Sequence, residues 1–86
     1  MAEDVAGIVR AVVARCADVP PEEIGPDTTF VHLRLGDHAK QRAADAVERE
    51  VGVMLLADDV ERMGTVGDLV EHVAGKRAEQ EAAEAP

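Results

Sequence analysis

Apolar side chains recur at helical spacing in three segments of the chain. The first segment runs from Val5 to about Arg15, the second from Asp37 to about Val51, and the third begins at Val66. In each of them apolar residues return every three or four positions, which places them on one side of a helix. No segment alternates apolar and polar residues as a half-buried strand does. The pattern therefore predicts an all-α domain.

Capping residues mark the ends of these helices. Asp37 is expected to cap the second helix, because its carboxylate accepts backbone N–H groups and complements the helix dipole. Gly52 is expected to end that helix. Thr65 followed by Asp68 matches a capping box at the start of the last helix. The face that the second helix buries is expected to be thin and rich in alanine, with Ala39, Ala43, Ala46, Val47 and, at its end, Val51.

Two further segments complete the predicted organisation. Residues 58–63 are expected to form one short turn of helix before Gly64. Past Gly75 the sequence is polar and alanine-rich, which is typical of a frayed chain end. We therefore expect one helical domain over residues 1–75 and a disordered tail over residues 76–86.

The connection over residues 17–36 is long for a compact domain. Pro20, Pro21 and Pro26 rule out a continuous helix there. Apolar residues are nevertheless spaced through it, among them Ile24 and Phe30. We expect this connection to pack onto the core, since long loops in small domains are usually functional or structured.

Composition excludes several classes of function. The chain has 86 residues with nine Lys and Arg against eighteen Asp and Glu, so its formal net charge is −9. Nucleic acid and anionic membranes are poor partners for such a chain, because binding phosphate requires clustered positive charge. Phe30 is the only aromatic residue, so no stacking platform for bases can form.

The cysteine content and the lack of long apolar runs indicate a cellular compartment. Cys16 is the only cysteine, which excludes an internal disulfide and suits a reducing environment. The first residues lack the charged start and apolar run of a secretory signal. The longest mostly apolar run, Val51–Ala57, is too short to span a membrane. We expect a cytoplasmic monomer.

Three segments of the sequence have a distinctive pattern: residues 19–30, residues 47–53 and residues 65–73. In that order they resemble the loop after the first helix, the end of the second helix and the start of the last helix of the acyl carrier protein family of polyketide and fatty-acid biosynthesis. The three segments occur in the family's order and separation. The resemblance implies a four-helix bundle whose third helix is short.

The sequence departs from the family where the family's cofactor is attached. Acyl carrier proteins have a Gly-x-Asp-Ser-Leu motif at the start of helix two, and its serine is esterified with 4′-phosphopantetheine. The corresponding residues here are Arg34-Leu35-Gly36-Asp37-His38. Counting from both sides places Asp37 at the serine position, and a shift of one residue would place His38 there. Neither side chain can form the phosphodiester, so we expect no 4′-phosphopantetheine.

Other side chains are weaker candidates for holding a cofactor or a metal or for acting as a nucleophile. The chain contains no serine, and its only hydroxyls of this type are Thr28, Thr29 and Thr65, none of which lies at the start of the second helix. Cys16 is expected to be a small, partly buried apolar residue. His32 and His38 do not have a metal-ligand spacing. A nucleophilic group of Cys16, His38 and Asp37 is conceivable, but nothing in the sequence brings the three together.

The charge of the second helix points to a protein partner. Residues 34–51 have no net charge, whereas the resemblance implies an acidic helix that binds basic enzyme surfaces. Cations expected at exposed positions would change the choice of partner. The predicted contacts are Arg34, Asp37, Lys40, Arg42 and Arg49.

These observations predict a non-catalytic function. We expect a carrier-like protein that docks on, scaffolds or regulates a biosynthetic enzyme in a bacterial polyketide or fatty-acid-type pathway. The alanine, valine and arginine usage suggests a bacterial genome rich in G and C. An alternative is an unconventional carrier that tethers its substrate through the Asp37 carboxylate. A third possibility is an enzyme that uses Asp37 and His38 as its acid and base.

Overall fold

The computed structural model describes residues 4–84 and contains helical elements separated by loops. Four α-helices are present in this range, with one 3-10 turn between the first two: α1 (Val5–Ala17), η1 (Pro21–Glu23), α2 (Asp37–Val51), α3 (Ala57–Arg62) and α4 (Val66–Glu84). Residues 4–84 form no strand, only an isolated bridge between Thr29 and Thr65. The predicted all-α fold with a short third helix is confirmed.

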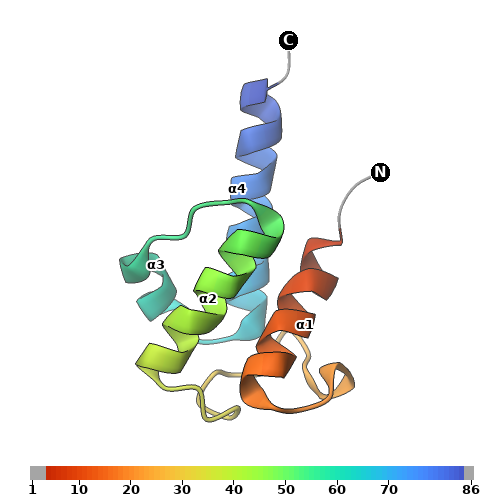
Figure 1. Ribbon diagram of the computed structural model, residues 1–86, viewed down its shortest axis with the longest axis vertical. Helices are drawn as coiled ribbons and strands as arrows, with labels where there is room; N and C mark the ends of the chain where they lie inside the picture. Colours follow the sequence, from red (N-terminus) through yellow and green to blue (C-terminus); the bar gives the residue numbers. More distant parts are fainter. Residues whose placement is uncertain (1–3, 85–86) are drawn as a thin grey trace.

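The helices pack as a bundle around α1. Helix α1 contacts both α2 and α4, and α3 lies against α2 at the side of the bundle (Figure 1). The last part of α4 extends beyond the other helices (Figure 1). Among residues 4–84, no helix combines the length and the apolar character needed to cross a membrane.

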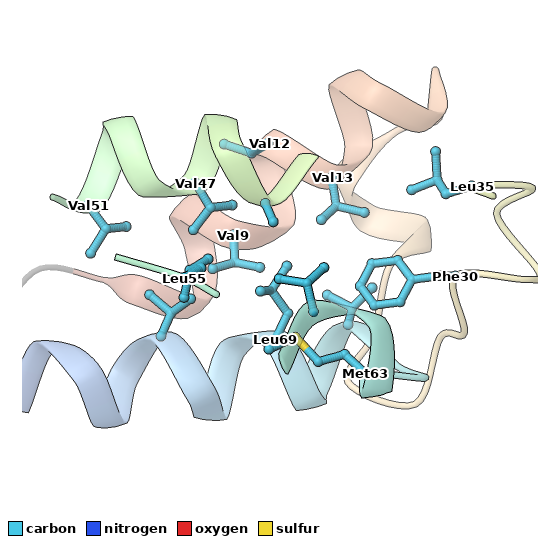
Figure 2. Packing of buried hydrophobic residues seen from close by; sticks show 14 of the residues in the cluster. Val9, Val12, Val13, Phe30, Leu35, Val47, Val51, Leu55, Met63 and Leu69 are labelled. Atoms are coloured by element: carbon cyan, nitrogen blue, oxygen red, sulfur yellow. The ribbon is translucent and has the colours of Figure 1, made fainter. Parts of the chain in front are cut away.

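Valines dominate the core between these helices. Val9, Val13, Val47 and Val73 are completely buried. Figure 2 shows Leu69 of α4 in the same cluster as Val9, Val13 and Val47. The long connection also reaches this core, because its side chains Ile24, Phe30 and Leu35 are buried. The prediction that the connection packs onto the core is confirmed.

The helix ends follow the predicted capping residues in two places. Gly52 adopts φ +82°, the left-handed conformation that glycine tolerates, and ends α2. The Thr65 hydroxyl accepts from the Asp68 N–H at 3.0 Å, while the Asp68 carboxylate accepts from the Thr65 N–H at 3.1 Å. The same carboxylate accepts from Gly64 N–H at 3.0 Å. These bonds hold the pKa of Asp68 below its ordinary value.

A short ladder of backbone hydrogen bonds joins the first connection to the start of α4. Three N–H groups donate across it: Phe30 to the Gly64 carbonyl at 3.1 Å, Val66 to Thr28 at 2.9 Å and Gly67 to Pro26 at 2.9 Å. A Cβ atom at Gly67 would lie 2.6 Å from the Pro26 carbonyl oxygen. The glycine is therefore required for this close approach of the two segments.

The expected end of the last helix at Gly75 is wrong. Helix α4 continues through residues 76–84, and side chains of this extension reach the end of α2. The Arg77 guanidinium donates to the Val51 carbonyl at 2.7 Å, and the Gln80 amide donates to the Gly52 carbonyl at 2.9 Å. The residues expected to form a disordered tail thus cap another helix. Only residues 85 and 86 of that segment lie outside the described residues.

Candidate functional site

The start of α2 is held by the loop that precedes it. Leu35 is buried, and its N–H donates to the Phe30 carbonyl at 3.0 Å. Between them, Arg34 adopts φ +60°, in the left-handed region that a residue with a side chain rarely occupies. Gly36 is then extended, with φ −70° and ψ 178°, and leads into the first turn of the helix.

Asp37 is the first residue of α2 and not its cap. Gly36 occupies the capping position, and no side chain caps the helix there. The predicted N-cap role of Asp37 is therefore wrong. Its carboxylate is exposed and has no hydrogen-bond or ion-pair partner among residues 4–84, as is also true of the exposed His38. The acidic side chain still complements the positive end of the helix dipole.

The threonine hydroxyls are engaged elsewhere. The Thr28 oxygen accepts from the Gly25 N–H at 2.9 Å, and the Thr29 oxygen accepts from the His32 N–H at 3.0 Å. Thr65 is occupied in the capping box of α4. Each hydroxyl thus stabilises a turn or a helix end in its own segment, away from the first turn of α2.

Lys40 is buried, which contradicts its expected exposure. Only 8% of the residue is accessible, and its ammonium nitrogen donates to the carbonyls of Glu61 at 3.1 Å and Met63 at 3.0 Å. The next residue, Gln41, donates to the Ala57 carbonyl at 3.0 Å. Together these side chains attach α3 to α2. A buried cation is stable there because carbonyl oxygens accept from two of its three N–H donors.

The outer face of α2 bears the charged residues that remain exposed. Four positions share this face, since they are separated by three or four residues: His38, Arg42, Asp45 and Arg49. Neither Arg42 nor Arg49 forms an ion pair within the described chain. Arg34, just before the helix, is likewise exposed and unpaired there. Four of the five predicted contact residues therefore lie at the surface.

The fold does not bring the other candidate side chains together. Cys16 is exposed and not partly buried as expected. No hydrogen bond joins it to Asp37 or His38 within residues 4–84. In the same range, no group of three or more His, Cys, Asp or Glu residues is arranged to hold a metal ion.

Several polar contacts of the structure were not predicted from the sequence. His72 of α4 faces Asp59 of α3, with 3.7 Å between the Nε2 and Oδ2 atoms, and its Nε2 makes no hydrogen bond in the described chain. Lys40 was missed although its position is informative. It precedes Ala43 by three residues and Val47 by seven, which places it on the apolar stripe of α2.

Comparison with known proteins agrees with this architecture. The family model described as the phosphopantetheine attachment site matches residues 7–73, which include most of α1, all of α2 and α3, and the first part of α4. The chain belongs to this family, whose members normally carry 4′-phosphopantetheine. The resemblance to acyl carrier proteins is thereby confirmed. No curated protein matches the chain.

Proposed function

We propose that this chain is a carrier-family protein without a phosphopantetheine arm and that it acts by binding another protein. The observation on which the proposal rests is the exposed Asp37 carboxylate in the first turn of α2, in a chain that contains no serine. A carboxylate that attacks a phosphate gives an acyl phosphate, which water cleaves, whereas an alcohol gives a lasting phosphodiester. The residues at this place therefore do not fit the cofactor.

The backbone at Arg34 supports this alignment with the family motif. Arg34 corresponds to the glycine of Gly-x-Asp-Ser-Leu when Asp37 corresponds to the serine. Its φ of +60° lies in the region that favours glycine. A left-handed residue three positions before Asp37 suits a position at which the family has glycine, while a register shifted to His38 would place Leu35 there.

The expected role is that of a non-catalytic docking, scaffolding or regulatory partner of a biosynthetic enzyme. Exposed side chains at and before α2 supply the contact surface: Arg34, Asp37, Arg42 and Arg49. Lys40 is not part of this surface, since its ammonium group is bound to α3. The proposed setting is a bacterial polyketide or fatty-acid-type pathway in the cytoplasm. The resemblance to acyl carrier proteins suggests the type of pathway, and the alanine, valine and arginine usage suggests the bacterial origin.

Intact mass tests the absence of the arm. We would measure the protein from its native host, and again after incubation with a broad-specificity phosphopantetheinyl transferase and coenzyme A. No added mass is expected in either sample. A variant that restores the full motif (Arg34→Gly, Gly36→Asp, Asp37→Ser and His38→Leu) is the positive control and should gain one phosphopantetheine. An arm on the unmodified sequence would refute the proposal.

A second candidate function follows from the accessibility of Asp37. Its carboxylate is exposed and unpaired within residues 4–84, so an activating enzyme can reach it. After activation with ATP, an amine or alcohol of the substrate would displace the activating group and form an amide or ester. A substrate mass mapped to Asp37 in protein from the native host would favour this tethering function over docking alone.

A further inference from the structure

A groove of about 840 Å³ lies on α1, between this helix, the segment that follows it and the end of α2. Gly7, Ile8 and Ala11 of α1 line it, and Pro20 and Pro21 form the side towards η1. Figure 1 shows η1 beside the end of α1, and the two elements are in contact. Because the side chains at positions 7 and 11 are small, the groove reaches close to the backbone of the helix.

The lining of this groove is largely apolar and meets water. Ala11, Pro20 and Pro21 are exposed, while Ile8 and Val19 are half-buried. Covering such a surface is favourable, since it removes apolar area from water. The groove is open to solvent rather than enclosed. Small molecules bind in clefts that bury most of their surface, so this shape suits side chains that a larger partner presents.

An acidic residue without a partner lies at one end of the groove. Asp18 ends α1 with φ 58°, and its exposed carboxylate makes no hydrogen bond or ion pair within residues 4–84. A carboxylate at this end of a helix is repelled by the negative end of the helix dipole. Its charge and the last carbonyl groups of α1 therefore attract a cation from outside to the same place.

The neighbouring charges reinforce this attraction. Glu22 and Glu23 directly follow the lining residue Pro21, and both are exposed and without an ion pair in the described chain. Among the described residues that line the groove, Arg15 is the only cation. Its guanidinium pairs with Glu50 of α2 at 3.4 Å, across the groove from Pro21. The Asp18 end of the groove thus has an excess of negative charge.

We propose that this groove binds a basic segment of a partner protein, which places an apolar side chain against Ile8 and Ala11 and a lysine or arginine beside Asp18. The inference goes beyond the proposed function, because it assigns a second surface. Glu50 is thirteen residues from Asp37, which corresponds to about 20 Å along α2. The groove therefore does not depend on what Asp37 carries.

Charge complementarity favours a basic segment over other occupants. A second copy of this chain would bring its own net charge of −9 to an acidic end of the groove. Nucleic acid and anionic membranes would be repelled for the same reason. A segment with an apolar anchor and one or two cations satisfies both the lining and the carboxylates.

An NMR titration with defined peptides tests the proposal. The 15N-labelled full chain would be titrated with a peptide of sequence Arg-Leu-Ala-Leu-Arg with blocked ends. Glu-Leu-Ala-Leu-Glu is the charge control, and Arg-Ala-Ala-Ala-Arg is the control for the apolar anchor. We expect saturable shifts of amides in residues 7–21 with the first peptide and at least about threefold weaker binding of each control.

Two variants with matched controls locate the contact. Ala11→Gln puts a larger polar side chain into the groove, whereas Ala6→Gln makes the same change at an exposed position of α1 outside the lining. Asp18→Asn removes the charge and retains a residue that tolerates the left-handed conformation. Asp45→Asn on α2 is its control. Ala11→Gln and Asp18→Asn should each weaken peptide binding by about threefold or more, and the two controls should leave it unchanged.

Several outcomes would overturn the proposal. Equal binding of the glutamate peptide would show that charge does not select the occupant, and shifts confined to other helices would place binding elsewhere. Absence of saturable binding at millimolar peptide would also refute it. Shifts of the groove amides with protein concentration alone would assign the groove to a second copy.

The titration and the mass measurement fail independently. An added arm with intact peptide binding would refute the proposed function and leave the groove's partner standing. An unmodified chain that does not bind the peptide would refute only the inference about the groove.

Discussion

The ammonium nitrogen of Lys40 lies 5.6 Å from the centre of the Phe30 ring. This distance is within the range of a cation–π interaction, and the only aromatic ring of the chain thus faces its only buried lysine. The same nitrogen donates to two carbonyls at the end of α3. One side chain of α2 therefore holds both the long connection and the short third helix.

Replacing Lys40 tests this attachment. Lys40→Met retains most of the aliphatic stem but leaves the Glu61 and Met63 carbonyls without their donor. We expect the free energy of unfolding to fall by about 1–3 kcal/mol in denaturant titrations. Arg42→Met, an exposed change on the same helix, is the matched control and should shift it by less than about 0.5 kcal/mol. Equal effects would contradict the buried position of Lys40.

The capping box of α4 predicts a pH dependence. The pKa of Asp68 is lowered mainly by hydrogen bonds from the Gly64 and Thr65 N–H groups. A carboxyl whose pKa is lower in the folded state stabilises the fold above its unfolded pKa, and this contribution is lost as pH falls through the folded pKa. Asp68→Asn should therefore lower the midpoint of unfolding at pH 7. The difference in midpoint between this variant and the unmodified protein should become smaller below about pH 4. Glu71→Gln, which removes a carboxylate at an exposed position nearby without removing a capping hydrogen bond, is the matched control.

Alanine substitutions at two glycines of α4 should change the stability of the protein in opposite directions. Gly67→Ala places a Cβ 2.6 Å from the Pro26 carbonyl oxygen, so the ladder must shift, and we expect a loss of about 1–3 kcal/mol. Nothing lies within 4 Å of a Cβ at Gly75. Because Gly75 is inside the helix, Gly75→Ala should stabilise the protein by about 0.5–1 kcal/mol. Thermal unfolding of both variants checks the pair, and a neutral Gly75→Ala would contradict the continuation of α4.

The extension of α4 should protect the end of α2 from hydrogen exchange. Arg77→Met removes the donor to the Val51 carbonyl, and Gln80→Ala removes the donor to the Gly52 carbonyl. Each change should speed amide exchange in the last turn of α2 while leaving α3 unaffected. Glu79→Ala, on the same extension and exposed, is the control. A disordered extension would give unchanged exchange in all three variants.

The sequence predicted local structure well and long-range polar contacts poorly. Helix α2 begins and ends at the expected residues because Gly52 can adopt the left-handed conformation and apolar spacing is a local property. The capping box at Thr65 is equally local. The spacing of Lys40 from Ala43 and Val47 indicates its burial, but its carbonyl partners lie more than twenty residues further along the chain, and no local pattern identifies them.

The candidate site was predicted in part for the same reason. Exposure of Arg34, Asp37, Arg42 and Arg49 follows from their positions off the apolar stripe. The expected cap at Asp37 failed because the extended Gly36 supplies the capping position without a side chain. Helix α4 passes Gly75 because Arg77 and Gln80 contact α2, and this tertiary support outweighs the low helix propensity of one glycine.

The ladder between the first connection and the start of α4 has a kinetic consequence. It joins Pro26 to Gly67, so that α2 and α3 lie within a closed loop of about 40 residues. Isolated helices form within about a microsecond, whereas contacts between distant segments must first offset the entropy of closing the loop. The meeting of these two segments, more than the formation of any helix, should set the rate at which the chain folds.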